Sequence, residues 1–389
     1  MREVEADTPV WKIADAVTAG SVTAEAVTRT TLDRIAATNG GINAVTDLLA
    51  DRALATARRV DADRSSGKPL GPMAGVPFAV KNLFDIKGLT TRAGSKINRD
   101  LPPATEDGVL IQRLESAGAV LVGALNMGEY AYDFTGENAH DGPCRNPHDP
   151  SRMAGGSSSG SGAAVGAGMV PLALGSDTNG SIRVPASFCG VFGLKPTYGR
   201  LSRFGSFPFC DSLDHLGPFA HSARDLALAY DVMQGPGAGD AASAERPVEP
   251  SLPTLEDGIS DLRCALLGGF FSTDGMPEAE AAVRAVTRAL DITAQDEAEG
   301  VEAGRAAAFI ITNVESANLH MANLQSRVDE FAPDTRDRFL AGALLPGTWY
   351  VRAQQVRKWY RDRFNRLFRE FDILITPATP FTAPEIGQR

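Results

Sequence analysis

The sequence predicts an α/β fold, because apolar runs of strand length alternate with stretches of helical periodicity. The run GVPFAV at 75–80 and the run AVLVGAL at 119–125 have the length and composition of buried strands. Between them, residues 109–118 repeat apolar side chains at helical spacing. Strands that alternate with helices favour a largely parallel sheet, since each connection can then cross one face of the sheet.

The remaining elements follow from the same two patterns in chain order. Residues 10–62 have helical periodicity, and Asn39-Gly40-Gly41 predicts a break in it. Further strands are predicted from short apolar runs, which lie at 170–175, 262–271 and 372–381. Further helices are predicted from periodic or small-residue stretches, which lie at 163–169, 181–190, 278–293 and 351–371.

The length of 389 residues favours one large domain or two ordinary ones. We predict a single domain over residues 1–389, with its core at about 70–217. Residues 233–258 are rich in Gly, Pro, Ala and Glu and lack periodicity, which predicts a surface excursion. This excursion separates the core from a C-terminal part at 259–389.

The composition excludes several classes of function. A formal net charge of −10 would repel phosphate backbones, so we expect no direct binding of nucleic acid. The four cysteines lack CxxC spacing and the five histidines lack HxxxH or HExxH spacing, which disfavours a disulfide framework and a metal site. The first residues carry mixed charges, and no run reaches the roughly 18 apolar residues of a membrane span. These features predict a cytoplasmic protein without a metal.

Serine and glycine crowd the segment at 153–187, MAGGSSSGSGAAVGAGMVPLALGSDTNGSIRVPAS. A flexible tether would have polar, aperiodic neighbours, whereas this segment lies among predicted helices and strands. A phosphate-binding loop is disfavoured because neither GxxxxGK[ST] nor GxGxxG occurs. Nucleophilic chemistry with serine is the interpretation that remains.

A serine hydroxyl needs a base to take its proton, and the developing oxyanion needs positioned donors. The run Thr178-Asn179-Gly180-Ser181 offers a serine at a sharp turn with successive backbone N–H groups. No GxSxG elbow is present, so a histidine base is disfavoured. The alternative base is a desolvated lysine, and Lys81 follows the apolar run GVPFAV directly. Since a free lysine titrates near about 10.4, Lys81 must be buried to act as a base at neutral pH.

Two stretches resemble the amidase signature family. GGSSSGSGAAVGAGMVPLALGSDTNGSIRVPASFCGVFGLKPTYGRLS resembles the family's signature, and GVPFAVKNLFD resembles the segment with its catalytic lysine. The likeness extends over about 70–217 and implies a large mixed, twisted sheet flanked by helices on both faces. It also implies a Ser–cisSer–Lys triad, with Ser181 as nucleophile, Ser157 as the bridging serine on a cis peptide and Lys81 as base. The oxyanion hole would be formed by backbone N–H groups, those of Thr178, Asn179, Gly180 and Ser181.

Several neighbours have two possible roles. Asp177 and Arg183 flank the nucleophile and are predicted either to bind substrate or to form a buried ion pair. Ser158 is predicted to bind substrate or to support the site, and Ser158 and Ser159 are also predicted to cap the following helix. Ser159 and Asn179 stand where family members often have glycine. If the site of Ser159 requires a positive φ, the turn is strained, and Asn179 either shapes the substrate pocket or tolerates an unusual backbone angle.

The resemblance implies hydrolysis of a carbon–nitrogen bond through an acyl-enzyme with release of ammonia, without a cofactor. Stretches such as HLGPFAHS are most similar to family members that hydrolyse carboxybiuret, a small urea-like amide, in cyanuric acid breakdown. Two alternatives stay open: a glutamine-hydrolysing subunit of a glutamyl-tRNA amidotransferase, and an inactive or truncated binding scaffold. Family members usually continue beyond the equivalent of Arg389, so the chain is predicted to be a truncated version that lacks part of the sheet and pocket.

The predicted partners are a small amide substrate and further protein chains. The resemblance implies a small helical companion chain, with assembly as a homo-oligomer or hetero-oligomer. The arginines of the predicted helix at 351–371 indicate a solvated helix face, with a surface for a partner or an anionic substrate as the alternative.

Overall fold

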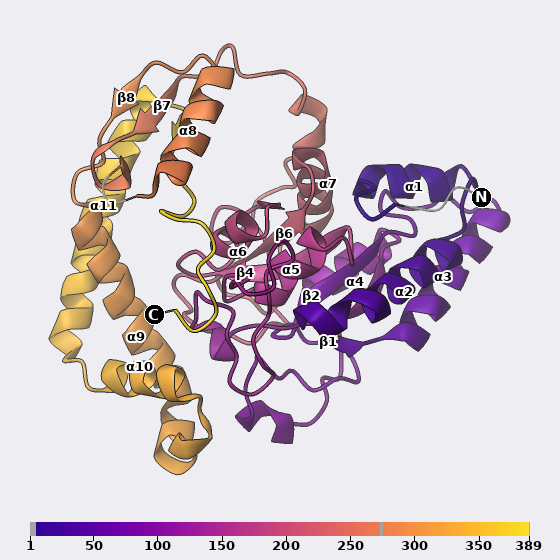
Figure 1. The fold of residues 1–389 in the computed structure, drawn as a ribbon, viewed down its shortest axis with the longest axis horizontal. Helices are drawn as coiled ribbons and strands as arrows, with labels where there is room; N and C mark the ends of the chain where they lie inside the picture. The colour runs from indigo at the N-terminus through magenta and orange to yellow at the C-terminus, as the bar shows by residue number, and fades with distance from the viewer. Residues whose placement is uncertain (1–4, 273–274, 389) are drawn as a thin grey trace. The chain divides into compact units, whose positions relative to one another are not determined.

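The computed structural model describes residues 5–272 and 275–388 and divides into two compact units (Figure 1). Unit 1 consists of the chain up to Leu255, of Asp329–Thr335 and of the residues from Glu385 on. Unit 2 consists of Glu256–Val328 and Arg336–Pro384. The first boundary lies inside the predicted surface excursion, whose residues 234–251 form no helix or strand. The division into compact units does not test whether the chain forms one domain, so the single domain over residues 1–389 remains a prediction.

Unit 1 is built on a six-stranded sheet in the order β1-β3-β2-β4-β6-β5. Its strands are β1 (Val45–Leu48), β2 (Pro77–Lys81), β3 (Val120–Leu125), β4 (Leu172–Asp177), β5 (Phe192–Gly193) and β6 (His215–Ala220). β2 runs parallel to both β3 and β4, whereas the other pairs are antiparallel. The mixed sheet is therefore confirmed. The largely parallel sheet holds only at the centre, because an apolar run indicates that a strand is buried but not its direction.

The helices of unit 1 lie on both faces of this sheet (Figure 1). They are α1 (Val10–Thr18), α2 (Ala24–Ile42), α3 (Ala50–Ser65), α4 (Val109–Ser116), α5 (Ser159–Gly166), α6 (Arg183–Phe188) and α7 (Ala223–Met233). Every residue of β2, β3 and β4 is buried, as expected for strands covered on both sides. The carboxyl ends of β2 and β4 therefore meet at one enclosed edge, where the site is built.

The predicted break at Asn39-Gly40-Gly41 is wrong, because α2 continues through it to Ile42. The helix ends at Asn43, which has a left-handed φ of 59°. The side chain of Asn39 accepts hydrogen bonds from the N–H groups of Ala44 and Val45 at 2.9 and 2.8 Å. Asparagine and glycine thus mark the end of this helix rather than a gap within it.

Unit 2 contains a three-stranded parallel sheet in the order β8-β7-β9. Its strands are β7 (Cys264–Leu267), β8 (Gln295–Asp296) and β9 (Ile373–Ile375), and its helices are α8 (Pro277–Ala289), α9 (Val301–Ser326), α10 (Pro333–Ala343, whose first residues belong to unit 1) and α11 (Gly347–Glu370). Two strands and two helices here were predicted, but β8 and α10 were missed, and so was the long helix α9. Its buried face contains small and polar residues such as Ala307, Thr312 and Ser316, which weakens the apolar pattern.

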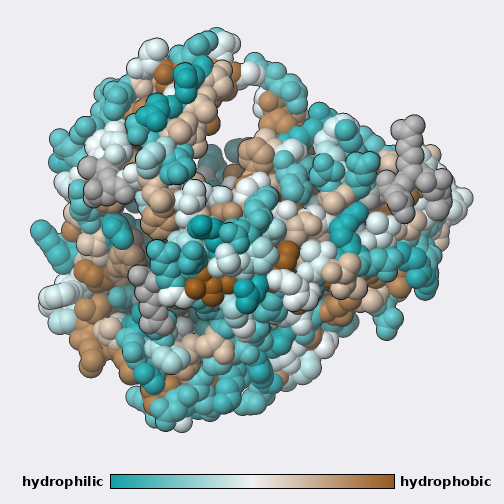
Figure 2. Space-filling model, viewed as in Figure 1, coloured by the Kyte–Doolittle hydropathy of each residue, from teal (hydrophilic) through white to brown (hydrophobic). Residues whose placement is uncertain are grey.

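The surface is mostly polar on the face drawn in Figure 2, with apolar residues in smaller groups. At α10 and α11, Leu344, Trp349 and Val351 are exposed by 83%, 55% and 57%. Within the described residues, each helix is either too short or too polar to cross a membrane.

Candidate active site

Lys81 is the last residue of β2, and its side chain is completely buried. Its Nζ lies 2.7 Å from the Oγ of Ser157 and 2.9 Å from the Oγ of Ser176. Burial lowers the pKa of Lys81 to about 7, against the opposing charges of Asp214, Asp177 and Asp133. The structure thus meets the requirement derived from the sequence, a desolvated amine in contact with a serine hydroxyl.

Ser157 lies in the loop between β3 and α5, and the peptide bond between Gly156 and Ser157 is cis, as the resemblance implies. Gly155 has a φ of 80°, and a Cβ there would come within 3.0 Å of the backbone of Pro185. The N–H groups of Gly155 and Gly156 donate to the carbonyls of Thr135 and Phe134 at 3.1 and 2.9 Å. The two glycines therefore allow the loop to pack tightly, with Ser157 fully buried against the amine.

Ser158 occupies the N-cap position of α5, but its side chain forms no capping hydrogen bond, which corrects that prediction. Its Oγ donates to the carbonyl of Ser176 at 3.1 Å and accepts from the N–H of the same residue at 3.2 Å. Its N–H donates to the carbonyl of Ser181 at 3.3 Å. Ser159 is the first residue of α5 and has no positive φ, so the predicted strain is absent. Ser158 thus joins the Ser157 loop to β4 and to the turn that follows it.

Asp177, at the end of β4, organises the turn that contains Ser181. Its carboxylate accepts from the N–H groups of Gly180 and Ile182 at 2.8 and 3.1 Å. It also forms a bidentate ion pair with Arg183, at 2.9 Å to Nε and 2.8 Å to Nη2. Burial alone would raise the pKa of Asp177, but the ion pair with Arg183 and the hydrogen bonds from the backbone together hold this pKa below its usual value. Of the two predicted roles, the geometry shows the ion pair.

The backbone N–H groups predicted for the oxyanion hole all belong to this turn, Thr178–Ser181. That of Gly180 donates to Asp177 at 2.8 Å and is therefore not free to bind an oxyanion, unlike the expectation from the sequence. Gly180 has a φ of 138° that an L side chain rarely adopts. Ser181 follows it and is 3% exposed. The Oγ of Thr178 donates to Asp214 at 2.6 Å. Both ends of the turn are thereby fixed by carboxylates.

Replacing Asp177 by alanine is expected to lower the free energy of unfolding by about 3 kcal/mol, the lower end of the range for breaking a buried ion pair. The lower end applies because Arg183 is 46% exposed and can regain water. Urea denaturation measures the change. The matched control is Asp149→Ala, since the exposed pair of Asp149 with Arg152 should contribute little to the free energy of unfolding. Equal losses in both variants would contradict the role given to Asp177.

Sequence reasoning missed three polar residues around the lysine. Ser176 contacts the amine directly, and Asp214 and Asp133 act on its charge. The available signal for Ser176 was a polar residue near the end of a fully buried strand. Asp214 and Asp133 lie in loops, where the sequence alone gives no sign that they approach Lys81.

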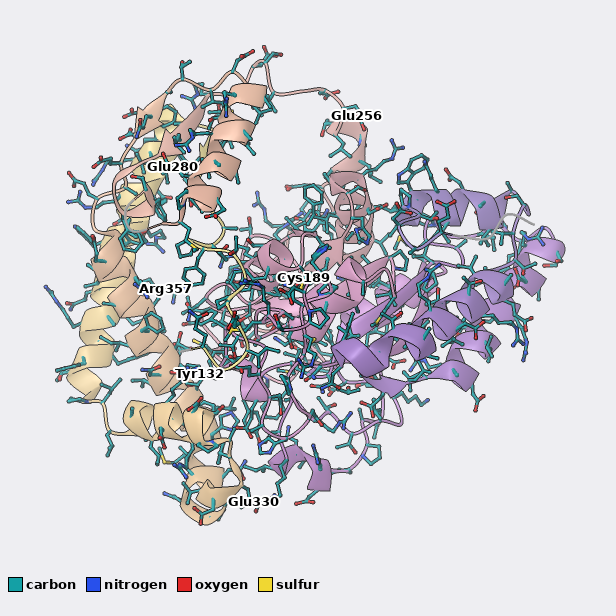
Figure 3. All side chains as sticks on the ribbon, viewed as in Figure 1. Tyr132, Cys189, Glu256, Glu280, Glu330 and Arg357 are labelled. Carbon is teal, nitrogen blue, oxygen red and sulfur yellow. The ribbon has the colours of Figure 1, made fainter. Side chains whose placement is uncertain are left out.

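A pocket of about 350 Å³ in unit 1 reaches this group of residues. Its wall includes Ser176, Asp214, Arg203 and Phe209. The ring of Phe209 packs on that of Tyr132, labelled in Figure 3, with centroids 4.9 Å apart. The pocket has room for a small molecule next to one of the two hydroxyls that contact Lys81.

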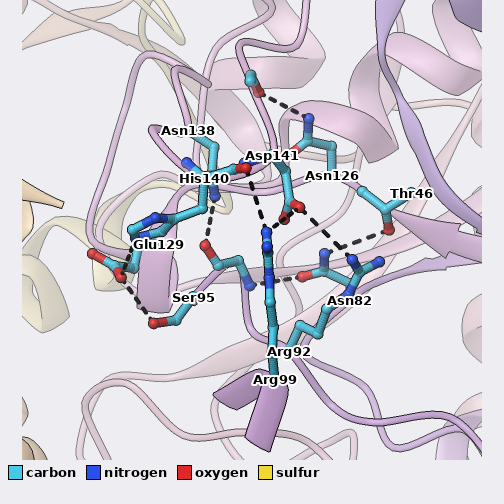
Figure 4. Close-up of polar contacts among 12 residues, drawn as sticks. Thr46, Asn82, Arg92, Ser95, Arg99, Asn126, Glu129, Asn138, His140 and Asp141 are labelled. Carbon is cyan, nitrogen blue, oxygen red and sulfur yellow. Dashed lines mark hydrogen bonds and ion pairs between the residues drawn. The ribbon is translucent and has the colours of Figure 1, made fainter. Parts of the chain in front are cut away.

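A polar network fixes the loops beyond β2 and β3 (Figure 4). Asn82 follows directly on β2, and its side-chain oxygen accepts from the N–H of Gly94 at 2.9 Å. Buried Glu129 accepts from the Oγ of Ser95 at 2.8 Å and lies 2.9 Å from the Nε2 of His140. Among the described residues, no group of His, Cys, Asp and Glu side chains could hold a metal ion. These bonds hold the loop that follows Lys81 and join it to the loop that follows β3.

The sequence model of the amidase family matches residues 26–389 of this chain. Over 376 residues the chain is 55% identical to AtzE of Pseudomonas sp. (strain ADP), which is a 1-carboxybiuret hydrolase subunit, and the match covers 97% of this chain and 82% of that protein. It is 39% identical to a glutamyl-tRNA(Gln) amidotransferase subunit of Anaeromyxobacter sp. (strain K), where the match covers 96% of this chain and 81% of the relative.

A solved structure with a similar sequence also has a similar fold. It superposes with a TM-score of 0.96 at 54% identity and covers 98% of this chain and 83% of the other. That structure is described as an unexpected vestigial protein complex that reveals the evolutionary origins of an s-triazine catabolic enzyme.

Proposed function

The chain belongs to the amidase family, and from this premise we propose that it hydrolyses a carbon–nitrogen bond of a small urea-like amide through Lys81, Ser157 and Ser181. The observation that carries the proposal is the completely buried amine of Lys81, 2.7 Å from the hydroxyl of Ser157 on a cis peptide. A buried lysine without an ion pair is costly, so its presence at this edge of the sheet needs a chemical reason.

In the proposed mechanism, neutral Lys81 accepts a proton from Ser157, which takes the proton of Ser181. The Oγ of Ser181 then attacks the carbonyl carbon, and backbone N–H groups of the turn 178–181 other than that of Gly180 hold the oxyanion. When the carbon–nitrogen bond breaks, the proton returns through Ser157 to the leaving nitrogen, which departs as ammonia or an amine. Water attacks the acyl-enzyme by the same relay and releases the acid.

We propose 1-carboxybiuret or a closely related compound as substrate, which is supported by the 55% identity to the carboxybiuret hydrolase subunit. The second candidate is glutamine, supported by the 39% identity to the amidotransferase subunit. Ammonia release from each compound by the purified protein separates the two. We expect turnover of 1-carboxybiuret and none of glutamine, unchanged by EDTA because no step uses a metal. Glutaminase activity alone would overturn the substrate assignment.

We further propose that the protein works in the cytoplasm, in an assembly that includes a small helical companion subunit. All four cysteines are free thiols, which suits a reducing compartment. The similar structure described as a protein complex supports an assembly, as do the exposed apolar side chains of Leu344, Trp349 and Val351. Light scattering of the purified chain tests whether it forms oligomers by itself.

The rate of hydrolysis is expected to rise with pH through about 7 and to level off above it. Lys81 acts as a base only when neutral, and burial lowers its pKa to about 7, so the active fraction grows as the pH rises past that value. The measurement is kcat/KM from about pH 5.5 to about 9. A rate that falls with rising pH over this range would contradict the lysine base.

A further inference from the structure

Asp214 lies immediately before β6 and is nearly buried, with 9% of its surface exposed. One carboxylate oxygen, Oδ1, accepts from the Oγ of Thr178 at 2.6 Å. The other, Oδ2, accepts from the N–H groups of Phe209 and Cys210 at 2.8 and 2.9 Å. Asp214 therefore ties the first residue of the 178–181 turn to the loop that forms one wall of the pocket.

Asp214 also acts on the charge of Lys81. Three carboxylates favour the ammonium form of this amine, and the effect of Asp214 is the largest. Asp177 is neutralised by its bidentate pair with Arg183. Asp133 is held by its own loop, since it accepts from the N–H groups at 135 and 136 at 2.7 and 2.6 Å. Asp214 thus has the strongest effect on the amine among the three carboxylates and also bonds directly to the turn.

The charges around Asp214 leave its carboxylate without a full ionic partner. Arg203, the cation that acts on it, is engaged by Asp240 at 2.9 Å and by Asp211 at 3.1 Å. Burial raises the pKa of Asp214, and hydrogen bonds from Thr178 and the backbone oppose this effect. The bond with Thr178 is therefore the contact through which Asp214 reaches the 178–181 turn.

We propose that Asp214 is a positioning residue of this reaction, whose carboxylate holds the turn carrying Ser181 through its hydrogen bond with Thr178. The inference rests on the proposed function. It assigns Asp214 no contact with substrate. The residue acts through Thr178 on the nucleophile turn and through space on the base.

Two variants separate the two effects. In Asp214→Asn the charge is lost, so the ammonium form of Lys81 loses stabilisation and the rising limb of the pH profile moves to lower pH. In Thr178→Val the charge stays and the bond to the turn is lost, so the limb stays in place and the plateau rate falls about tenfold or more. Thr178→Ser restores the hydroxyl and should recover most of the plateau rate.

The readout is the second-order rate of covalent labelling of Ser181 by a fluorophosphonate, measured against pH. It needs no knowledge of the substrate. Glu106→Gln is the control, because Glu106 is an exposed carboxylate of unit 1 outside the pocket wall, and its loss should leave the pH midpoint unchanged.

The outcomes distinguish this inference from the proposed function. If the wild type is labelled, but Asp214→Asn keeps its midpoint or Thr178→Val keeps the full plateau rate, the positioning role is wrong and the proposed function stands. The two variants Thr178→Val and Thr178→Ser still test the positioning role if Asp214→Asn fails to fold. If the unmodified protein is not labelled at any pH, both the proposed function and this inference are overturned.

Discussion

Replacing Lys81 by methionine is expected to reduce kcat/KM by about 10³-fold or more, since the variant lacks the base that starts the proton relay. The amine contacts two hydroxyls, those of Ser157 and Ser176. The methionine side chain has nearly the same length but cannot accept a proton. Ammonia release from the preferred amide measures the loss.

The same substitution should leave the fold intact. The wild-type structure carries the cost of desolvating an ammonium group, which an apolar side chain of similar volume does not. The midpoint of thermal unfolding of Lys81→Met should therefore be no lower than that of the wild type. The matched control is Lys96→Met, at an exposed lysine, which should keep full activity. Turnover retained by Lys81→Met would remove the lysine from the mechanism.

Replacing Ser181 by alanine is expected to abolish both turnover and covalent labelling, with a fall in rate of at least about 10³-fold. The alanine lacks the only atom proposed to bond the substrate carbon, and the loss of one buried hydroxyl should disturb the fold little. Mass spectrometry of the intact chain after treatment with a fluorophosphonate measures the adduct. Ser65→Ala, at an exposed serine of α3, is the control and should be labelled like the wild type.

This experiment also decides between an enzyme and an inactive scaffold. A scaffold whose signature survives without a working nucleophile would give no adduct even in the wild type. An adduct that persists in Ser181→Ala would instead assign the reactive group to another residue. Only labelling that depends on Ser181 agrees with the proposed triad.

The site residues that could be predicted are those whose environment follows from their neighbours in the sequence. Lys81 comes at the end of an apolar run, so its burial was predictable, and the cis peptide before Ser157 followed from a motif. The contacts of Ser176 and Asp214 could not be foreseen. They arise because β2 and β4 are parallel neighbours and β6 returns antiparallel beside β4. Strand direction is set by the whole sheet, so these partners came into view only with the fold.

The strand patterns were reliable at the centre of the molecule and weaker at its margins. β2, β3 and β4 are continuous apolar runs because both faces of the sheet are covered. β5 is only two residues long and β1 is half-buried, so neither leaves a periodic pattern. The 26-residue helix α9 was missed because small and polar residues on its buried face weaken the apolar pattern.

The two hydroxyls at the amine of Lys81 have a consequence for where its lone pair points. An ammonium group has three hydrogens to give and nothing with which to receive one, so both Ser157 and Ser176 must then act as acceptors. After deprotonation, the nitrogen keeps two hydrogens and a single lone pair. If Ser176 continues to receive one hydrogen, the lone pair is free to turn toward Ser157. By accepting a hydrogen from Lys81, Ser176 thereby directs the base to deprotonate Ser157 rather than Ser176.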